Sequence, residues 1–277
     1  MWVIAVVANA IMSAILAPFR SVPAIGLLIV SIVTGIVMLL IFGKTSNQSA
    51  IRHAKAKLKA HIAEIWLFRD DLAQMLLATL RVLGHTARYF LNSLRPMVFI
   101  LVPVLIIMVT LGVRFAHRPF RPEESAVVAV FLDDAAWTRD QSVRLTAPVG
   151  IEVVSPALRI PARREIDWRI RVARAGTHQL TVSTPRGEVT KRIEVRQNTR
   201  PLTALAASRG RTFSAAFLEY PVEPPLPAST GVREIRVVGW PERELHVLGL
   251  KVHWLVVFFA VSLAAGFAVK DLFRVEV

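Results

Sequence analysis

The chain contains no cysteine among its 277 residues. This absence excludes disulfide bonds, thiolate metal sites and a cysteine nucleophile. The common catalytic motifs are also missing, because no HExxH, GxSxG, GxGxxG or phosphate-binding glycine loop occurs. None of the seven histidines has acidic neighbours at a metal-ligand spacing. We therefore expect a protein that is not an enzyme and that holds no cofactor or metal.

Acidic residues are scarce as well, with 20 Asp and Glu against 34 Lys and Arg. The hydrophobic fraction is 54% and the mean hydropathy is +0.50, which is typical of membrane proteins. Residues 44–95 carry nine Lys and Arg against three Asp and Glu. No basic run is interleaved with aromatic residues, so a specific nucleic-acid partner is not expected. The expected partner of this basic stretch is a membrane surface.

Three apolar segments predict membrane-spanning helices within residues 21–43, 96–116 and 251–277. Their uncharged stretches are Val22–Gly43, Pro96–Phe115 and Trp254–Val269, and Pro103 predicts a kink in the second. Residues 1–20 contain a shorter apolar helix, which either spans the bilayer or lies at its surface. On that helix Asn9 and Ser13 share one face, because they are four residues apart.

The basic residues 44–95 predict a cytoplasmic helical hairpin between the first two spans. Gln48–Phe68 has helical apolar spacing, the joint Arg69-Asp70-Asp71 follows, and a second amphipathic helix continues to Leu91. The bias of positive charge toward the cytoplasm places this hairpin and the C-terminus inside. The expected location is the bacterial inner membrane, with the intervening residues 117–250 outside the cytoplasm.

Residues 117–250 change to a period of two, which predicts short strands. Trp168, Ile170 and Val172 alternate with Asp167, Arg169 and Arg171, so one face of this strand should be buried. Short strands at this spacing predict an extracytoplasmic β-sandwich resembling an immunoglobulin domain. The predicted strands are Ala126–Leu132, Ser142–Thr146, Gly150–Val154, Glu165–Val172, His178–Ser183, Glu188–Val195 and Arg233–Val238.

Few polar residues lie in or near the apolar segments, and they have two interpretations. Arg20 and Arg114 fall on the outer side, where long cationic side chains usually reach the lipid headgroups. Alternatively, Ser31, Thr34, Thr110 and Arg20 line a half-wet groove for polar parts of a client segment. Gly26 and Gly35 suit a close approach of helices.

The hairpin and its flanking spans resemble the YidC/Oxa superfamily of membrane insertases. The likeness lies in IFGKTSNQSAIRHAKAKLKAH with its Asn47-Gln48 joint, in Arg69-Asp70-Asp71, and in LRPMVFILVPVLIIM with Pro96-Met97 and Pro103. It is nearer to the short archaeal members and to the related subunit of the ER membrane protein complex. Two features differ: Ser31–Phe42 lacks the arginine of the family's first core helix, and a β domain replaces the short loop before the last span.

This resemblance implies a protein that assists the insertion or assembly of other membrane proteins. Arg52, Lys55, Lys57 and Lys59 would then contact a client or the ribosome in the cytoplasm. The alternative is a membrane-anchored scaffold subunit whose β domain binds a partner outside. A third hypothesis is a sensor that passes binding at the β domain to the hairpin.

Overall fold

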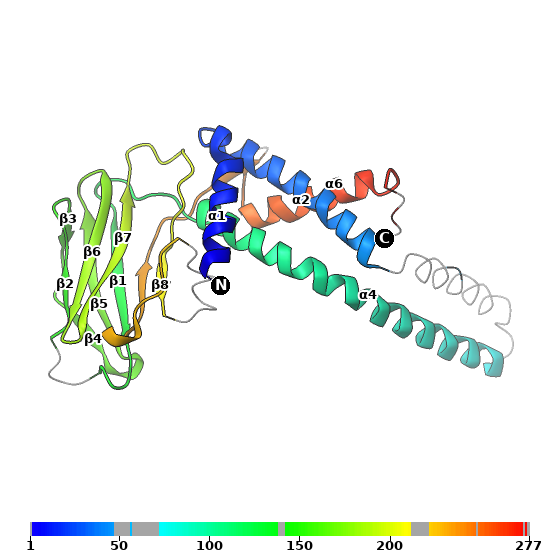
Figure 1. The fold of residues 1–277 in the computed structure, drawn as a ribbon, viewed down its shortest axis with the longest axis horizontal. Helices are drawn as coiled ribbons and strands as arrows, with labels where there is room; N and C mark the ends of the chain where they lie inside the picture. Colours follow the sequence, from blue (N-terminus) through cyan, green and yellow to red (C-terminus); the bar gives the residue numbers. More distant parts are fainter. Residues whose placement is uncertain are drawn as a thin grey trace. The chain divides into compact units, whose positions relative to one another are not determined.

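The computed structural model describes residues 2–46, 56, 72–137, 142–211, 222–247, 249–273 and 275. The chain forms two compact units, and Figure 1 labels most of their helices and strands. The unit of Met1–Gly26 and Leu105–Trp254 is called the sheet unit below. The unit of Leu27–Val104 and Leu255–Val277 is called the helical unit.

The helical unit contains most of α2 (Pro23–Thr45), the first part of α4 (Leu72–Phe115) and nearly all of α6 (Trp254–Val269). Two helical segments are long and apolar enough to cross a membrane, namely α2 and the Met97–Phe115 part of α4. Helix α6 has 16 residues, which corresponds to about 24 Å against a bilayer core of about 30 Å. The third predicted span therefore stays a prediction.

Helix α4 is one continuous element of 44 residues. The sequence predicts a second hairpin helix and a separate span opening at Pro96, whereas the structure joins the two. A proline inside a helix removes one backbone hydrogen bond but does not have to end the helix. The kink at Pro103 stays a prediction. The first predicted hairpin helix, Gln48–Phe68, lies outside the described residues except for Ala56.

Helices α2 and α6 pack with their backbones in close contact at Gly35. A Cβ atom added to Gly35 would lie 2.1 Å from the carbonyl oxygen of Ser262, and Gly266 faces the same turn of α2. Gly26 has the same role in the sheet unit, where its added Cβ would meet Leu16 and Phe19 at 3.0 and 3.1 Å. The prediction that both glycines permit close approach is confirmed.

The sheet unit begins with α1 (Trp2–Leu16) and the short helix η1 (Ala17–Phe19). Its larger sheet has six strands in the order β3-β5-β1-β9-β8, with β4 also paired to β5. The smaller sheet has the order β2-β6-β7, and β10 and β11 form a separate hairpin. Neighbouring strands in all three are antiparallel. The strands are β1 Ser125–Leu132, β2 Arg144–Thr146, β3 Ile151–Val153, β4 Leu158–Ile160, β5 Glu165–Val172, β6 Gly176–Thr184, β7 Gly187–Val195, β8 Ser208–Gly210, β9 Val232–Val238, β10 Leu245–Val247 and β11 Leu250–Val252.

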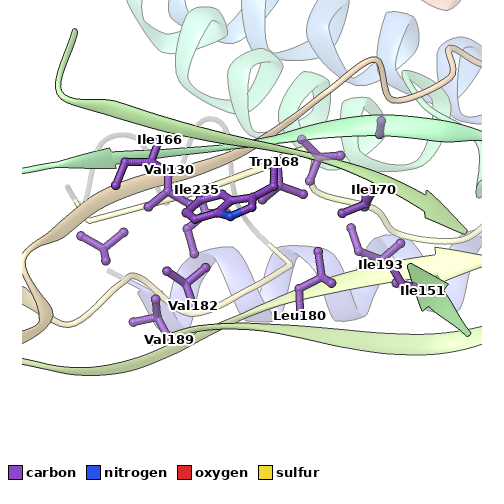
Figure 2. Packing of buried hydrophobic residues seen from close by; sticks show 14 of the residues in the cluster. Val130, Ile151, Ile166, Trp168, Ile170, Leu180, Val182, Val189, Ile193 and Ile235 are labelled. Carbon is purple, nitrogen blue, oxygen red and sulfur yellow. The ribbon is translucent and has the colours of Figure 1, made fainter. Parts of the chain in front are cut away.

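The six-stranded sheet and the β2-β6-β7 sheet share one hydrophobic core, which Figure 2 shows from close by. Trp168 and Ile170 of β5 face Leu180 of β6 and Ile193 of β7 across it. Arg169 and Arg171, between the buried positions of β5, are exposed. The predicted alternation along this strand is therefore confirmed, because inward apolar positions are two residues apart on a pleated strand.

Seven predicted strands correspond to β1, β2, β3, β5, β6, β7 and β9, with ends that shift by at most two residues. The sequence missed β4, β8, β10 and β11, each of three residues. Strands this short contain too few positions for a period of two to be recognised. The finer prediction of an immunoglobulin-like domain is not tested by these pairings.

Candidate functional site

The most polar feature at an apolar helix end is Arg114, in the last turn of α4. Its side chain is buried, with only 4% exposed. Its Nη1 donates hydrogen bonds to Asn9 Oδ1 at 2.8 Å and to the Thr110 carbonyl at 2.5 Å. Its Nη2 donates to the Asn9 carbonyl at 2.8 Å and to Ser13 Oγ at 2.7 Å. We call Asn9, Ser13, Thr110 and Arg114 the arginine cluster.

Helix α1 is suited to hold this arginine because its polar residues lie on one face. Asn9 and Ser13 are four residues apart, so a single helix face presents both to α4. Met12 and Leu16 of the same helix are buried. Each buried polar atom of the guanidinium needs a partner to offset the cost of its desolvation, and α1 supplies three of them.

Backbone hydrogen bonds fasten the C-terminal end of α4 to the β domain. The last carbonyls of a helix lack partners within it and must be satisfied elsewhere. Leu205 N donates to the Val113 carbonyl at 2.7 Å, and Arg243 N donates to the Ala116 carbonyl at 3.0 Å. Within the sheet unit, the β domain is thus bonded directly to the end of α4.

The sequence-predicted groove residues are distributed over the two units. In the sheet unit, Thr110 is buried and Oγ1 donates to the Ile107 carbonyl at 2.9 Å, whereas the side chain of Arg20 is exposed. In the helical unit, Ser31 and Thr34 are buried, and Ser31 Oγ donates to the Leu27 carbonyl at 2.7 Å. Both bonded hydroxyls therefore donate to their own helix. A client groove stays a prediction.

The basic residues predicted to meet a client lie outside the described residues. These are Arg52, Lys55, Lys57 and Lys59.

The arginine cluster is what the sequence reasoning missed. The spacing places Asn9 and Ser13 on one helix face and Arg114 near the end of an apolar segment, but it does not show that they meet. A signal was present, because a charge near the end of an apolar helix needs a buried partner or a wet surface. An apolar helix with two polar residues on one face is the natural place to search for that partner.

A second buried charge lies inside the β domain. Lys191 points into the core from β7, is not exposed at all, and forms an ion pair with Glu223. Its Nζ also donates to the Ala206 carbonyl at 2.7 Å and lies 5.8 Å from the centre of the Trp240 ring. Burial lowers the pKa of Lys191, and the carboxylate of Glu223 opposes this change. Lys191 is enclosed by the core, and Glu223 is 8% exposed.

His117 follows α4 and packs against the β domain. Its ring centre lies 6.4 Å from that of Trp240, and its Nδ1 is buried with no hydrogen-bond partner among the described residues. Burial lowers the pKa of His117, while Glu242 and a backbone hydrogen bond of Pro241 oppose the shift. The ring therefore favours its neutral form in the folded protein.

In the part of the chain that the structure describes, no group of three or more His, Cys, Asp or Glu could hold a metal ion. The buried cations have hydrogen-bond partners that fix them in place, which suits packing and positioning.

Comparison of the chain with protein-family models, with curated proteins and with solved structures gave no match.

Proposed function

We propose that the protein is an insertase-like integral membrane protein, which assists the insertion or assembly of other membrane proteins. In this proposal α2, Met97–Phe115 and α6 span a bacterial inner membrane. The hairpin and the C-terminus lie in the cytoplasm, where the excess of Lys and Arg over residues 44–95 favours their retention. The β domain lies outside.

The observation that supports this proposal most is the length of α4. The helix begins at Leu72, 25 residues before the candidate span Met97–Phe115. At about 1.5 Å per residue, this part would extend about 37 Å beyond the hydrocarbon. It would reach well past the headgroups and could receive a client before the client enters the bilayer.

The extending part of α4 has chemistry suited to such contacts. Leu80 and Leu83 are each 60% exposed, so they offer apolar surface to a hydrophobic client. Arg81, Arg88 and Arg95 belong to the same stretch of sequence and add to its positive charge. Apolar contacts would hold the client segment, and the basic residues would favour acidic partners such as the ribosome surface.

The proposal is tested by site-specific photocrosslinking in cells, with the crosslinker at Leu83 or Lys55 and, as a control, at Arg144 of β2. We expect crosslinks to newly made membrane proteins from Leu83 and Lys55 only. These crosslinks should disappear when translation is stopped. Equal crosslinking from Arg144, or no dependence on translation, would contradict an insertase-like role.

A second candidate function is a membrane-anchored scaffold, and the surface of the β domain favours it. Val149, Val154 and Leu158 are 82%, 50% and 61% exposed near the short strands β3 and β4. Apolar side chains at a sheet edge suit binding of another chain. The scaffold would be indicated by one stable partner that crosslinks at Leu158 after translation has stopped and is lost in Val149→Asp/Leu158→Asp.

A further inference from the structure

The sheet unit contains a basic cavity of about 760 Å³ beside the β10–β11 hairpin. Arg118 and Arg121 line it from the segment after α4, and Arg200 lines it from the segment after β7. Arg243 and Lys251 come from the stretch that contains the hairpin. Two acidic residues, Glu242 and Glu244, line the cavity as well.

The cavity lies at the ends of two apolar helices. Arg118 and Arg121 follow Phe115, the last residue of α4, by three and six positions. Lys251 and His253 lie directly before α6, which begins at Trp254. The two helix ends are neighbours, because a Cβ added to Gly112 would lie 3.6 Å from Cζ2 of Trp254. If these helices span a membrane, the cavity lies at the level of the lipid headgroups.

Ion pairs neutralise only part of the charge in the cavity. Arg118 pairs with Glu124 at 2.7 Å, and Lys251 pairs with Glu244 at 2.6 Å. Arg121 and Arg200 are exposed, and neither guanidinium forms an ion pair with a described carboxylate. The lining thus contains four arginines and one lysine against two glutamates, which leaves an excess of positive charge.

Arg243 is the cation that gains most from an added anion. Its Nη1 and Nη2 donate to the carbonyls of Arg200 and Pro201 at 3.0 and 3.3 Å. Its Nε is buried and has no hydrogen-bond partner among the described residues. Burial, with a smaller contribution from the charge of Arg118, lowers the pKa of Arg243 to about 10. A nearby anion would oppose this lowering of the pKa, because it stabilises the charged guanidinium.

We propose that this cavity binds the phosphate group of an anionic lipid headgroup, with Arg121 and Arg200 as its accessible ligands and Arg243 as a third, half-buried cation in the same lining. Arginine suits this role because its planar guanidinium can donate two parallel hydrogen bonds to a phosphate. The choice of a lipid rests on the proposed membrane placement. A free phosphate has the same chemistry, and the experiment below separates the two sources.

The test uses the full chain in a non-ionic detergent and measures binding of three ligands by calorimetry. These are short-chain phosphatidylglycerol, short-chain phosphatidylcholine and inorganic phosphate. The variant Arg121→Gln/Arg200→Gln removes the two accessible cations. The matched control Arg144→Gln/Arg169→Gln removes two exposed arginines from β2 and β5, so both proteins lose the same charge.

We expect phosphatidylglycerol to bind the wild-type chain and the control equally, and to bind Arg121→Gln/Arg200→Gln at least about tenfold more weakly. Binding of inorganic phosphate alone with the same dependence would support the anion site and identify a soluble ligand. The proposal is overturned if neither anion binds, if phosphatidylcholine binds as tightly as phosphatidylglycerol, or if both variants weaken binding equally. The assay contains no client protein, so its failure is distinct from a failure of the insertase-like proposal.

Discussion

The Nη2 atom of Arg114 lies 2.7 Å from the hydroxyl oxygen of Ser13, although 101 residues separate the two in the chain. This contact joins the first helix of the protein to the end of α4. It converts a charge that burial at the end of an apolar helix disfavours into a specific link between two helices. Asn9 strengthens the link with both its side-chain and its backbone oxygen.

The arginine cluster should behave as a coupled unit. Arg114→Met leaves Asn9 and Ser13 without their donor, and Asn9→Leu/Ser13→Ala leaves the guanidinium short of acceptors. Each change should cost about 1–3 kcal/mol for every buried polar group left unpaired. The triple variant should recover much of this loss, because an apolar replacement of both sides removes the unpaired groups. Thermal unfolding in detergent measures the three variants. Additive losses in the triple variant would disprove the coupling.

Gly35 should tolerate no side chain. Gly35→Ala places a Cβ atom 2.1 Å from the Ser262 carbonyl oxygen, so α2 and α6 must separate. Overpacking of this kind costs about 1–3 kcal/mol. The matched control is Gly84→Ala in α4, where an added Cβ has no neighbour within 4 Å and alanine favours the helix. The melting temperature should fall for Gly35→Ala and stay or rise for Gly84→Ala. The reverse order would contradict the packing at Gly35.

Removing one member of the buried pair Lys191–Glu223 should destabilise the β domain more than removing both members. Lys191→Met leaves the buried carboxylate of Glu223 without its ion-pair partner, which costs about 3–5 kcal/mol. The double variant Lys191→Met/Glu223→Leu should be close to the wild type. Lys251→Met, which breaks an exposed pair with Glu244, should cost at most about 1 kcal/mol. Near-ultraviolet circular dichroism, which reports on Trp168 and Trp240 in this core, follows the unfolding. An equal loss for Lys191→Met and Lys251→Met would refute the prediction.

His117 should make the sheet unit less stable in mild acid. Its folded-state pKa lies below the ordinary value of 6.5, so between the two values the unfolded chain binds more protons than the folded chain. Stability therefore rises with pH through this interval and falls as the pH drops below about 6.5. His117→Gln should flatten this part of a plot of melting temperature against pH. Glu242→Gln should steepen it, because the carboxylate opposes the lowering of the pKa. A shallower slope in Glu242→Gln would contradict this account.

The sequence predicted those parts of the fold that depend on local pattern. The period-two spacing of Trp168, Ile170 and Val172 predicts a half-buried strand. The structure confirms it, because β5 has the predicted bounds Glu165–Val172. The long uncharged stretch Val22–Gly43 likewise predicts a helix, which the structure places at α2. In β7, Lys191 lies two residues from both Val189 and Ile193, so it shares their buried face. The period-two pattern of the sequence therefore also indicates that Lys191 is buried. These features are readable because backbone geometry fixes which neighbours share a face.

The tertiary structure alone decided which distant residues meet. Arg114 is held by Asn9, 105 residues away, and Lys191 by Glu223, 32 residues away. One cavity is lined by arginines from three separate segments, namely Arg121, Arg200 and Arg243. No local pattern specifies such partners, because they depend on how the helices and sheets pack. The buried charges then pair with whatever polar groups that packing brings near, since leaving them unpaired costs more than ordering a partner.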